Sequence, residues 1–222
     1  MTRVQTLWTV AAVLLPVYAY ADLEVTDAEG RPLEEAVVEI YWPNEDSGAR
    51  ARHEQSVLHE IMQRDAAFEP QVVAIATGDY IVFPNRDTAR HQVFSFSPAK
   101  TFSLDLYLQE TPPPVEFDTP GVVVLGCNIH DRMQAFAVVS EAPFYAMTDE
   151  NGRVDTGVVP AGNHRLRVWH PHLEPTHQQW WEGRFEGGHE KRVVLSLAAI
   201  PSEPEPPSAL QQRFRQAAGQ GS

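Results

Sequence analysis

The sequence has a single cysteine, Cys127, among its 222 residues. A chain with one thiol forms no disulfide within itself, so a disulfide-stabilised scaffold is excluded. A thiol in an oxidising compartment is buried, paired between chains or bound to a metal, and burial is the ordinary state of free cysteine. The neighbours of Cys127 therefore decide between these states.

Basic residues are also scarce. Lys and Arg total 17 against 30 Asp and Glu, which gives a formal net charge of −13. Because nucleic acids and anionic lipid surfaces attract positive charge, this balance argues against both as partners. It is compatible with steering towards a positively charged protein or a small cation.

Only one long apolar run is present, at residues 7–17. Arg3 precedes it, and residues 19–21 (Ala-Tyr-Ala) follow it with the small-x-small pattern of a signal-peptidase site. The run is too short to cross a bilayer comfortably, because a transmembrane helix needs about 20 apolar residues. We therefore predict a signal peptide over residues 1–21, cleaved after Ala21, and export to the periplasm. An uncleaved membrane anchor is the alternative.

Long helical patterns are nearly absent. Short apolar or alternating runs rich in Val, Ile, Phe and Tyr alternate with turn residues, which predicts an all-β sandwich protein. Only residues 53–65 have apolar positions at helical spacing, so we expect one helix there. The strands expected are 23–26, 36–42, 72–76, 80–83, 92–96, 102–106, 115–117, 122–125, 134–140, 165–169 and 192–197.

The C-terminal residues 201–222 differ in composition from the rest. Residues 201–207 are rich in Pro and Glu, which predicts an extended linker. Residues 209–218 have the composition of one short helix that ends at Gly219. We expect a flexible tail.

Three soft or borderline metal ligands, Cys127, His130 and Met133, lie within seven residues. Gly126 and Asn128 suit a turn, and β-like runs flank both sides, so the cysteine ends one strand and the methionine precedes the next. A thiolate, an imidazole and a thioether together select copper, or less often zinc. So short a loop does not close a site alone, and a fourth ligand must come from elsewhere.

His91 is the natural fourth ligand, because it follows the polar loop 85–90 and opens a strand. Two His and one Cys in a plane with a long axial Met form the ligand set of blue-copper electron-transfer sites. In the alternative interpretation, Cys127 and Met133 are core residues and the histidines lie in loops. The order and spacing of all four residues favour the metal site.

The two sequence blocks resemble a known family. Residues 78–85 with 91–93 are similar to the first-ligand region of plastocyanin and its relatives, and residues 119–133 resemble their second region. The Cys-x-x-His-x-x-Met spacing is similar to that of amicyanin, and both blocks with residues 94–100 resemble periplasmic methylamine-utilisation proteins. The resemblance implies a cupredoxin Greek-key sandwich with one type 1 copper, bound by His91, Cys127, His130 and Met133.

Two departures from the cupredoxin pattern stand beside these ligands. Gln92 occupies the position at which several cupredoxins have an Asn that braces the Cys loop. Asp131 and Arg132 place charges beside His130, where the family often has an apolar docking patch. The first departure bears on the rigidity of the site and the second on the choice of partner.

The ligand set favours an electron carrier over an enzyme, because a catalytic metal keeps an open coordination position. Multicopper oxidases and copper nitrite reductases need further histidines beside the cysteine, whereas Gly126 and Asn128 flank Cys127. We predict one-electron transfer with a protein partner, a cytochrome or a periplasmic oxidoreductase. The resemblance implies that the electron leaves through His130. A non-redox copper-binding, delivery or docking module is the alternative.

The flanks resemble a different domain. Residues 23–38 are similar to the first half of a carboxypeptidase-regulatory-like domain, and residues 148–168 to its second half. This resemblance implies that residues 22–42 and 143–200 form a second small β-sandwich, interrupted by a cupredoxin domain over residues 43–142 with its core at 61–140.

Four histidines raise the question of a second metal site. His170 and His172 lie on one side of an extended segment, with His177 and His164 nearby. Pro171 between them is unsuited to a central strand, so a surface loop is the favoured interpretation.

Overall fold

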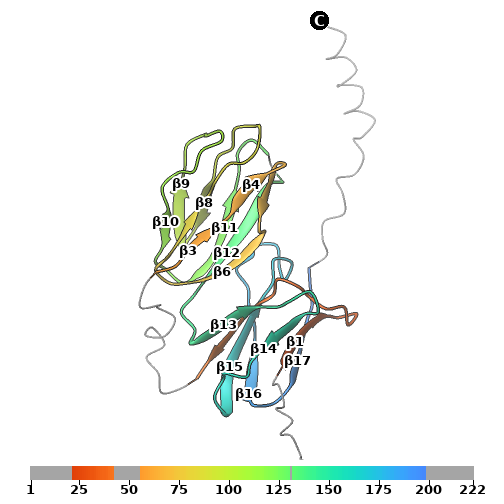
Figure 1. The fold of residues 1–222 in the computed structure, drawn as a ribbon. Helices are drawn as coiled ribbons and strands as arrows, with labels where there is room; N and C mark the ends of the chain where they lie inside the picture. Colours follow the sequence, from red (N-terminus) through yellow and green to blue (C-terminus); the bar gives the residue numbers. More distant parts are fainter. Residues whose placement is uncertain (1–21, 43–55, 131, 199–222) are drawn as a thin grey trace, which may run out of the picture.

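The structure is a computed structural model that describes residues 22–42, 56–130 and 132–198. These residues form strands and no helices, which confirms the all-β prediction. They build two β-sandwiches that lie one above the other in Figure 1. The proposed signal peptide and the C-terminal tail lie outside the described residues. No described helix is long and apolar enough to cross a membrane.

The first sandwich pairs a five-stranded sheet with a three-stranded sheet. The larger sheet has the order β6-β12-β11-β8-β9, and the smaller has the order β10-β7-β3. Their bounds are β3 Leu58–Glu60, β6 Val72–Ala76, β7 Asp79–Val82, β8 Phe94–Ser97, β9 Lys100–Ser103, β10 Val115–Phe117, β11 Gly121–Gly126 and β12 Gln134–Ser140. A separate hairpin joins β4 (Met62–Arg64) to β5 (Ala67–Glu69).

The second sandwich combines strands from both ends of the described chain. One sheet has the order β13-β2-β15-β16 and the other the order β14-β1-β17. Val38 in β2 lies opposite Val168 in β15. The bounds are β1 Asp22–Asp27, β2 Val37–Tyr41, β13 Phe144–Met147, β14 Arg153–Asp155, β15 Gly162–Trp169, β16 Trp181–Gly187 and β17 Lys191–Leu195.

A third apolar cluster joins the two sandwiches. Val37 and Trp169 of the second sandwich pack with Val72, Phe136 and Val138 of the first. The rings of Phe136 and Trp169 lie 5.4 Å apart. Because side chains alternate along a strand, β2 and β15 turn Val38 and Val168 into their own core and Val37 and Trp169 towards the neighbouring sandwich.

The helix expected over 53–65 is wrong for the residues that the structure describes. Residues 58–60 and 62–64 are strands, and residues 53–55 lie outside the described range. Val57 and Leu58, two of the positions that gave the helical spacing, are exposed, whereas Ile61 and Gln63 are buried on alternate positions. Pairing of β3 with β7 and of β4 with β5 therefore prevails over local helical spacing.

Candidate metal centre

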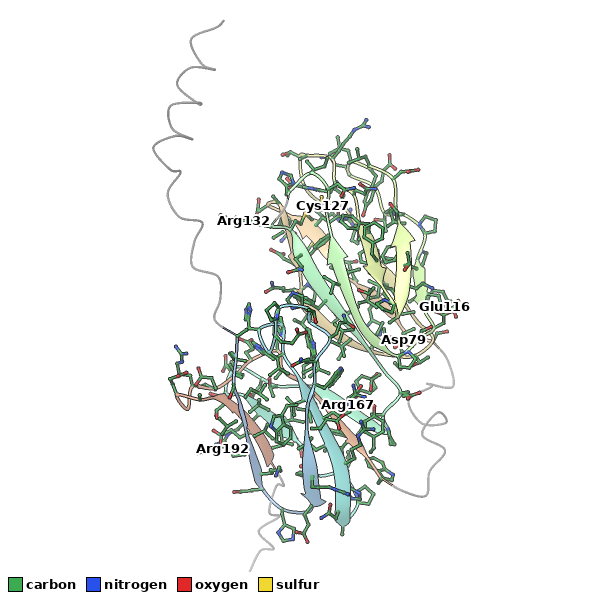
Figure 2. The ribbon with its side chains drawn as sticks, turned by 180° about the vertical axis from the view of Figure 1, so that it is seen from behind. Asp79, Glu116, Cys127, Arg132, Arg167 and Arg192 are labelled. Carbon is green, nitrogen blue, oxygen red and sulfur yellow. The ribbon has the colours of Figure 1, made fainter. Side chains whose placement is uncertain are left out.

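The ligand atoms of His91, Cys127 and His130 all lie within 4.8 Å of one another. Cys127 directly follows β11, and His130 lies in the short loop that leads to β12. His91 comes from a different segment, three residues before β8. Figure 2 shows Cys127 and Arg132 near one end of the first sandwich, with Asp79 and Glu116 towards its other end. The fold thus brings together ligands that are 36 residues apart in sequence.

Burial and unpaired nitrogen make this cluster suitable for a metal. His91 is fully buried and Cys127 is 5% exposed, while His130 is half-buried. The Nδ1 atom of His130 is buried and has no hydrogen-bond partner. Because an unpaired buried polar atom costs free energy, such an atom beside a thiol and a second imidazole fits a metal ligand. One sulfur and two nitrogen donors suit copper or zinc.

Met133 lies beside the same cluster. Its side chain is 2% exposed and belongs to the core of the first sandwich together with Cys127. The backbone N–H of Met133 donates a hydrogen bond to the carbonyl of His130, 2.9 Å away. This bond closes the loop between the two strands and places Met133 directly before β12.

The backbone of His91 is fixed by a neighbouring segment. His91 and Tyr107 exchange both backbone hydrogen bonds, each 3.1 Å long. The amide of Asn85 donates to the carbonyls of Ala89 and Tyr107, at 2.9 and 2.8 Å. Burial raises the pKa of Tyr107 to about 12, so its phenol remains protonated and donates to the carbonyl of Phe83.

The ring of His91 is held from the side opposite to the thiol. Its Nε2 lies 2.9 Å from Oδ2 of Asp87, and its Nδ1 lies 3.9 Å from Sγ of Cys127. Hydrogen bonds from the backbone N–H of Ala66 and from His91 hold the pKa of Asp87 well below its usual range. Asp87 is therefore a carboxylate that accepts from the imidazole.

The two ligand segments are also joined by side chains. The amide of Asn128 donates to Oε1 of Gln92 at 2.6 Å, and the Gln92 amide donates to Ser103. Gln92 thus connects the segment of His91 to the loop of Cys127 and braces that loop, although an Asn stands at its position in several cupredoxins. The longer side chain reaches a neighbouring amide.

The surface beside Cys127 and Met133 is uncharged and partly apolar. A groove of about 570 Å³ is lined by Cys127, Met133, Phe96 and Gln178 among other residues, none of them charged. Phe96 is 78% exposed and Ile129 is 52% exposed. Asn128 and Arg132 are also exposed, and Asp131 lies outside the described residues.

The histidines near residue 170 are bonded to the protein itself. Nδ1 of His170 accepts from the backbone N–H of His172, and its ring also bonds to the backbone of Glu34. His177 donates from Nδ1 to the carbonyl of Pro171, 2.8 Å away. Among the described residues these histidines form no group of three metal-ligating side chains, so the structure gives the second metal site no support.

Sequence reasoning assigned no role to Asp87, Asn85 or Tyr107, although all three position His91. A carboxylate four residues before a proposed His ligand was the available signal for Asp87. Tyr107 lies 16 residues beyond His91 and contacts it through an isolated bridge outside the named strands. No local pattern marks such a contact.

No family model and no curated protein matches this chain. Solved structures similar to part of it include a purple cupredoxin from Nitrosopumilus maritimus, at 18% identity and a TM-score of 0.32, over 37% of this chain and 99% of that one. A copper-containing nitrite reductase from Thermus scotoductus SA-01 is 22% identical, with a TM-score of 0.35, over 45% of this chain and 27% of that one. An oxidized amicyanin mutant is 14% identical, with a TM-score of 0.35, over 48% of this chain and all of that one.

Proposed function

We propose that this chain is a type 1 copper protein of the cupredoxin kind, which carries single electrons between protein redox partners. The observation that supports this most directly is the meeting of the ligand atoms of His91, Cys127 and His130 within 4.8 Å. Met133 is proposed as the weak fourth ligand. Bound by these residues, copper supplies a one-electron couple between Cu(I) and Cu(II).

The surrounding residues support rapid electron transfer by limiting movement of the ligands. His91 and Cys127 are buried, so water is kept from most of the site. The hydrogen bonds of Asp87 and Asn128 restrain the His91 ring and the Cys127 loop. A site that keeps one arrangement in both oxidation states reorganises little as the electron moves.

The half-buried His130 and its exposed neighbours favour electron exit at this surface. Ile129 and Arg132 are exposed on either side of His130 and offer a mixed apolar and charged contact. We propose a cytochrome or a periplasmic oxidoreductase as the partner. The compartment is proposed from the sequence of residues 1–21, which resembles a cleaved signal peptide.

The second sandwich is proposed as a docking or structural module of the carboxypeptidase-regulatory-like kind. The pairing of β2 with both β13 and β15 supports the assignment of residues 22–42 and 143–200 to one unit. Residues 43–142 are then the inserted cupredoxin domain.

The decisive experiment is repeated reduction and reoxidation of the copper-loaded protein, with bound metal measured after every cycle. An electron carrier keeps its copper and regains its visible absorption each time. A delivery protein loses copper to an added Cu(I) chelator after reduction, and that result would contradict the proposal. Cys127→Ser provides the matched control without the thiolate.

A further inference from the structure

Asp87 contacts the imidazole ring of His91 on the side away from the thiol of Cys127. Its Oδ2 lies 2.9 Å from Nε2 of His91, whereas Nδ1 of the same ring faces Sγ of Cys127 at 3.9 Å. A carboxylate only accepts hydrogen bonds, so the proton of the neutral imidazole belongs on Nε2. The lone pair on Nδ1 then points towards the thiol.

Asp87 is itself held in place by two backbone N–H groups, one from its own loop and one from another part of the chain. The backbone N–H of Ala66 donates to Oδ2 at 2.9 Å, and the N–H of Thr88 donates to Oδ1 at 2.7 Å. Ala66 belongs to the tight turn between β4 and β5, where Asp65 and Ala66 both have positive φ. The hairpin thus anchors the carboxylate that orients His91.

We propose that Asp87 is a positioning residue that fixes His91 as its Nε2–H tautomer and strengthens Nδ1 as a donor to copper. A carboxylate that accepts from a metal-bound imidazole orients the ring and raises its basicity. A stronger donor stabilises Cu(II) relative to Cu(I) and so lowers the reduction potential. The part that concerns copper rests on the function proposed above, whereas the tautomer is a property of the metal-free protein.

Long-range ¹H–¹⁵N correlation spectra of the metal-free protein test the tautomer. Wild type is expected to show His91 with its proton on Nε2. Asp87→Ala removes the acceptor, and signals of the Nδ1–H form should then appear for His91. A wild-type proton on Nδ1, or an unchanged tautomer in Asp87→Ala, would overturn the proposal.

Copper titration and potentiometry test the effect on the metal. Asp87→Asn keeps an oxygen acceptor of the same size but loses the charge, so Cu(II) affinity should fall about 10- to 100-fold and the potential should rise. Asp65→Asn removes the same charge from the exposed turn next to Ala66 and serves as the control, with both quantities unchanged. The same Cu(II) affinity and the same reduction potential in Asp87→Asn and Asp65→Asn would contradict the role of Asp87.

The two experiments separate the two proposals. If wild type binds no copper, the proposed function fails, and the spectra of the metal-free protein still decide the tautomer. If wild type binds copper but neither Asp87 variant changes tautomer, affinity or potential, only the positioning role fails.

Discussion

In the first sandwich, His91 and His130 turn ring nitrogens towards Cys127 without a backbone partner for those atoms. In the second sandwich, His170 and His177 direct ring nitrogens to backbone groups of their own loop. The residue type is the same, yet the partners of the nitrogens differ. A histidine becomes a candidate ligand when one ring nitrogen faces other metal-ligating atoms and is not already bonded to the backbone.

His164 shows that an unpaired nitrogen alone is insufficient. Its Nδ1 is also buried without a partner, while its Nε2 donates to the carbonyl of Pro160. His164 packs against the ring of Trp42. Among the described residues, His164 belongs to no group of three side chains that could hold a metal ion. The first sandwich differs by combining three donors at one point.

The largest expected effect separates the two histidine sets by colour. Cys127→Ser should abolish the visible absorption of the Cu(II) protein, because the thiolate bond to copper produces it. His91→Ala and His130→Ala should weaken or alter the absorption. The matched variant His170→Asn should leave the spectrum unchanged. If His170→Asn lost the visible absorption while His91→Ala and His130→Ala kept it, the metal site would not lie in the first sandwich.

Trp169→Ala tests how firmly the second sandwich supports the first. Trp169 is fully buried against Phe136, so its truncation should lower the free energy of unfolding by about 3–5 kcal/mol. Phe96→Ala, at a position 78% exposed, should change it by about 0.5 kcal/mol or less. Urea unfolding followed by tryptophan fluorescence and circular dichroism measures both. If Trp169→Ala lowered the free energy of unfolding no more than Phe96→Ala does, the apolar cluster between the sandwiches would contribute little to stability.

Acid should affect the second sandwich through His170. Burial, with a contribution from the nearby His172, lowers the pKa of His170 to about 4, below its ordinary value of 6.5. As pH falls, His170 is therefore protonated in the unfolded chain before it is protonated in the folded protein. The contribution of His170 to stability declines as pH falls from 6.5 to about 4. His170→Asn should reduce this decline in denaturation midpoints, whereas His189→Asn at an exposed position should not. Equal pH dependence of all three proteins would contradict this account.

Met133→Leu should have a smaller effect than loss of Cys127. An axial thioether bonds weakly to copper and mainly tunes the potential, so copper should remain bound and coloured while the potential rises. Absorption spectroscopy with potentiometry checks this. If Met133→Leu lost copper as completely as Cys127→Ser, Met133 would be a primary ligand and the site would be of another kind.

The smallest expected effect concerns docking. The acidic chain and the charge of Arg132 beside His130 predict that electron exchange with a cytochrome depends on ionic strength. Stopped-flow kinetics at low and high salt measure this dependence. Arg132→Ala should alter the dependence, and Arg192→Ala in the second sandwich is the matched control. Rates that do not change with salt would count against electrostatic docking.

The all-β class was predictable because short apolar runs and turn residues dominate the sequence. The strands at residues 115–117 and 134–140 were expected with the bounds observed. The three-residue strands β3 and β14 and the seven-residue strand β16 were not expected, because most of their residues are not buried. Only pairing with neighbours identifies them as strands.

The candidate site shows the same limit. The soft or borderline ligand types and their spacing select Cys127, His130 and Met133 within one loop, and the predicted start of a strand selects His91. The carboxylate of Asp87 and the turn at Ala66 were not predicted, since 21 residues of sequence separate these two partners. Side-chain contacts across such a separation follow from tertiary packing, which local spacing does not encode.

Titration of the metal-free wild-type protein with Cu(II), followed by visible absorption and electron paramagnetic resonance, tests the central claim most directly. We predict saturation at one copper per chain, an intense visible band from the Cys127 thiolate, and a narrow copper hyperfine splitting. Stoichiometric binding without strong visible absorption, or no binding, would contradict the assignment of a type 1 copper site at His91, Cys127 and His130.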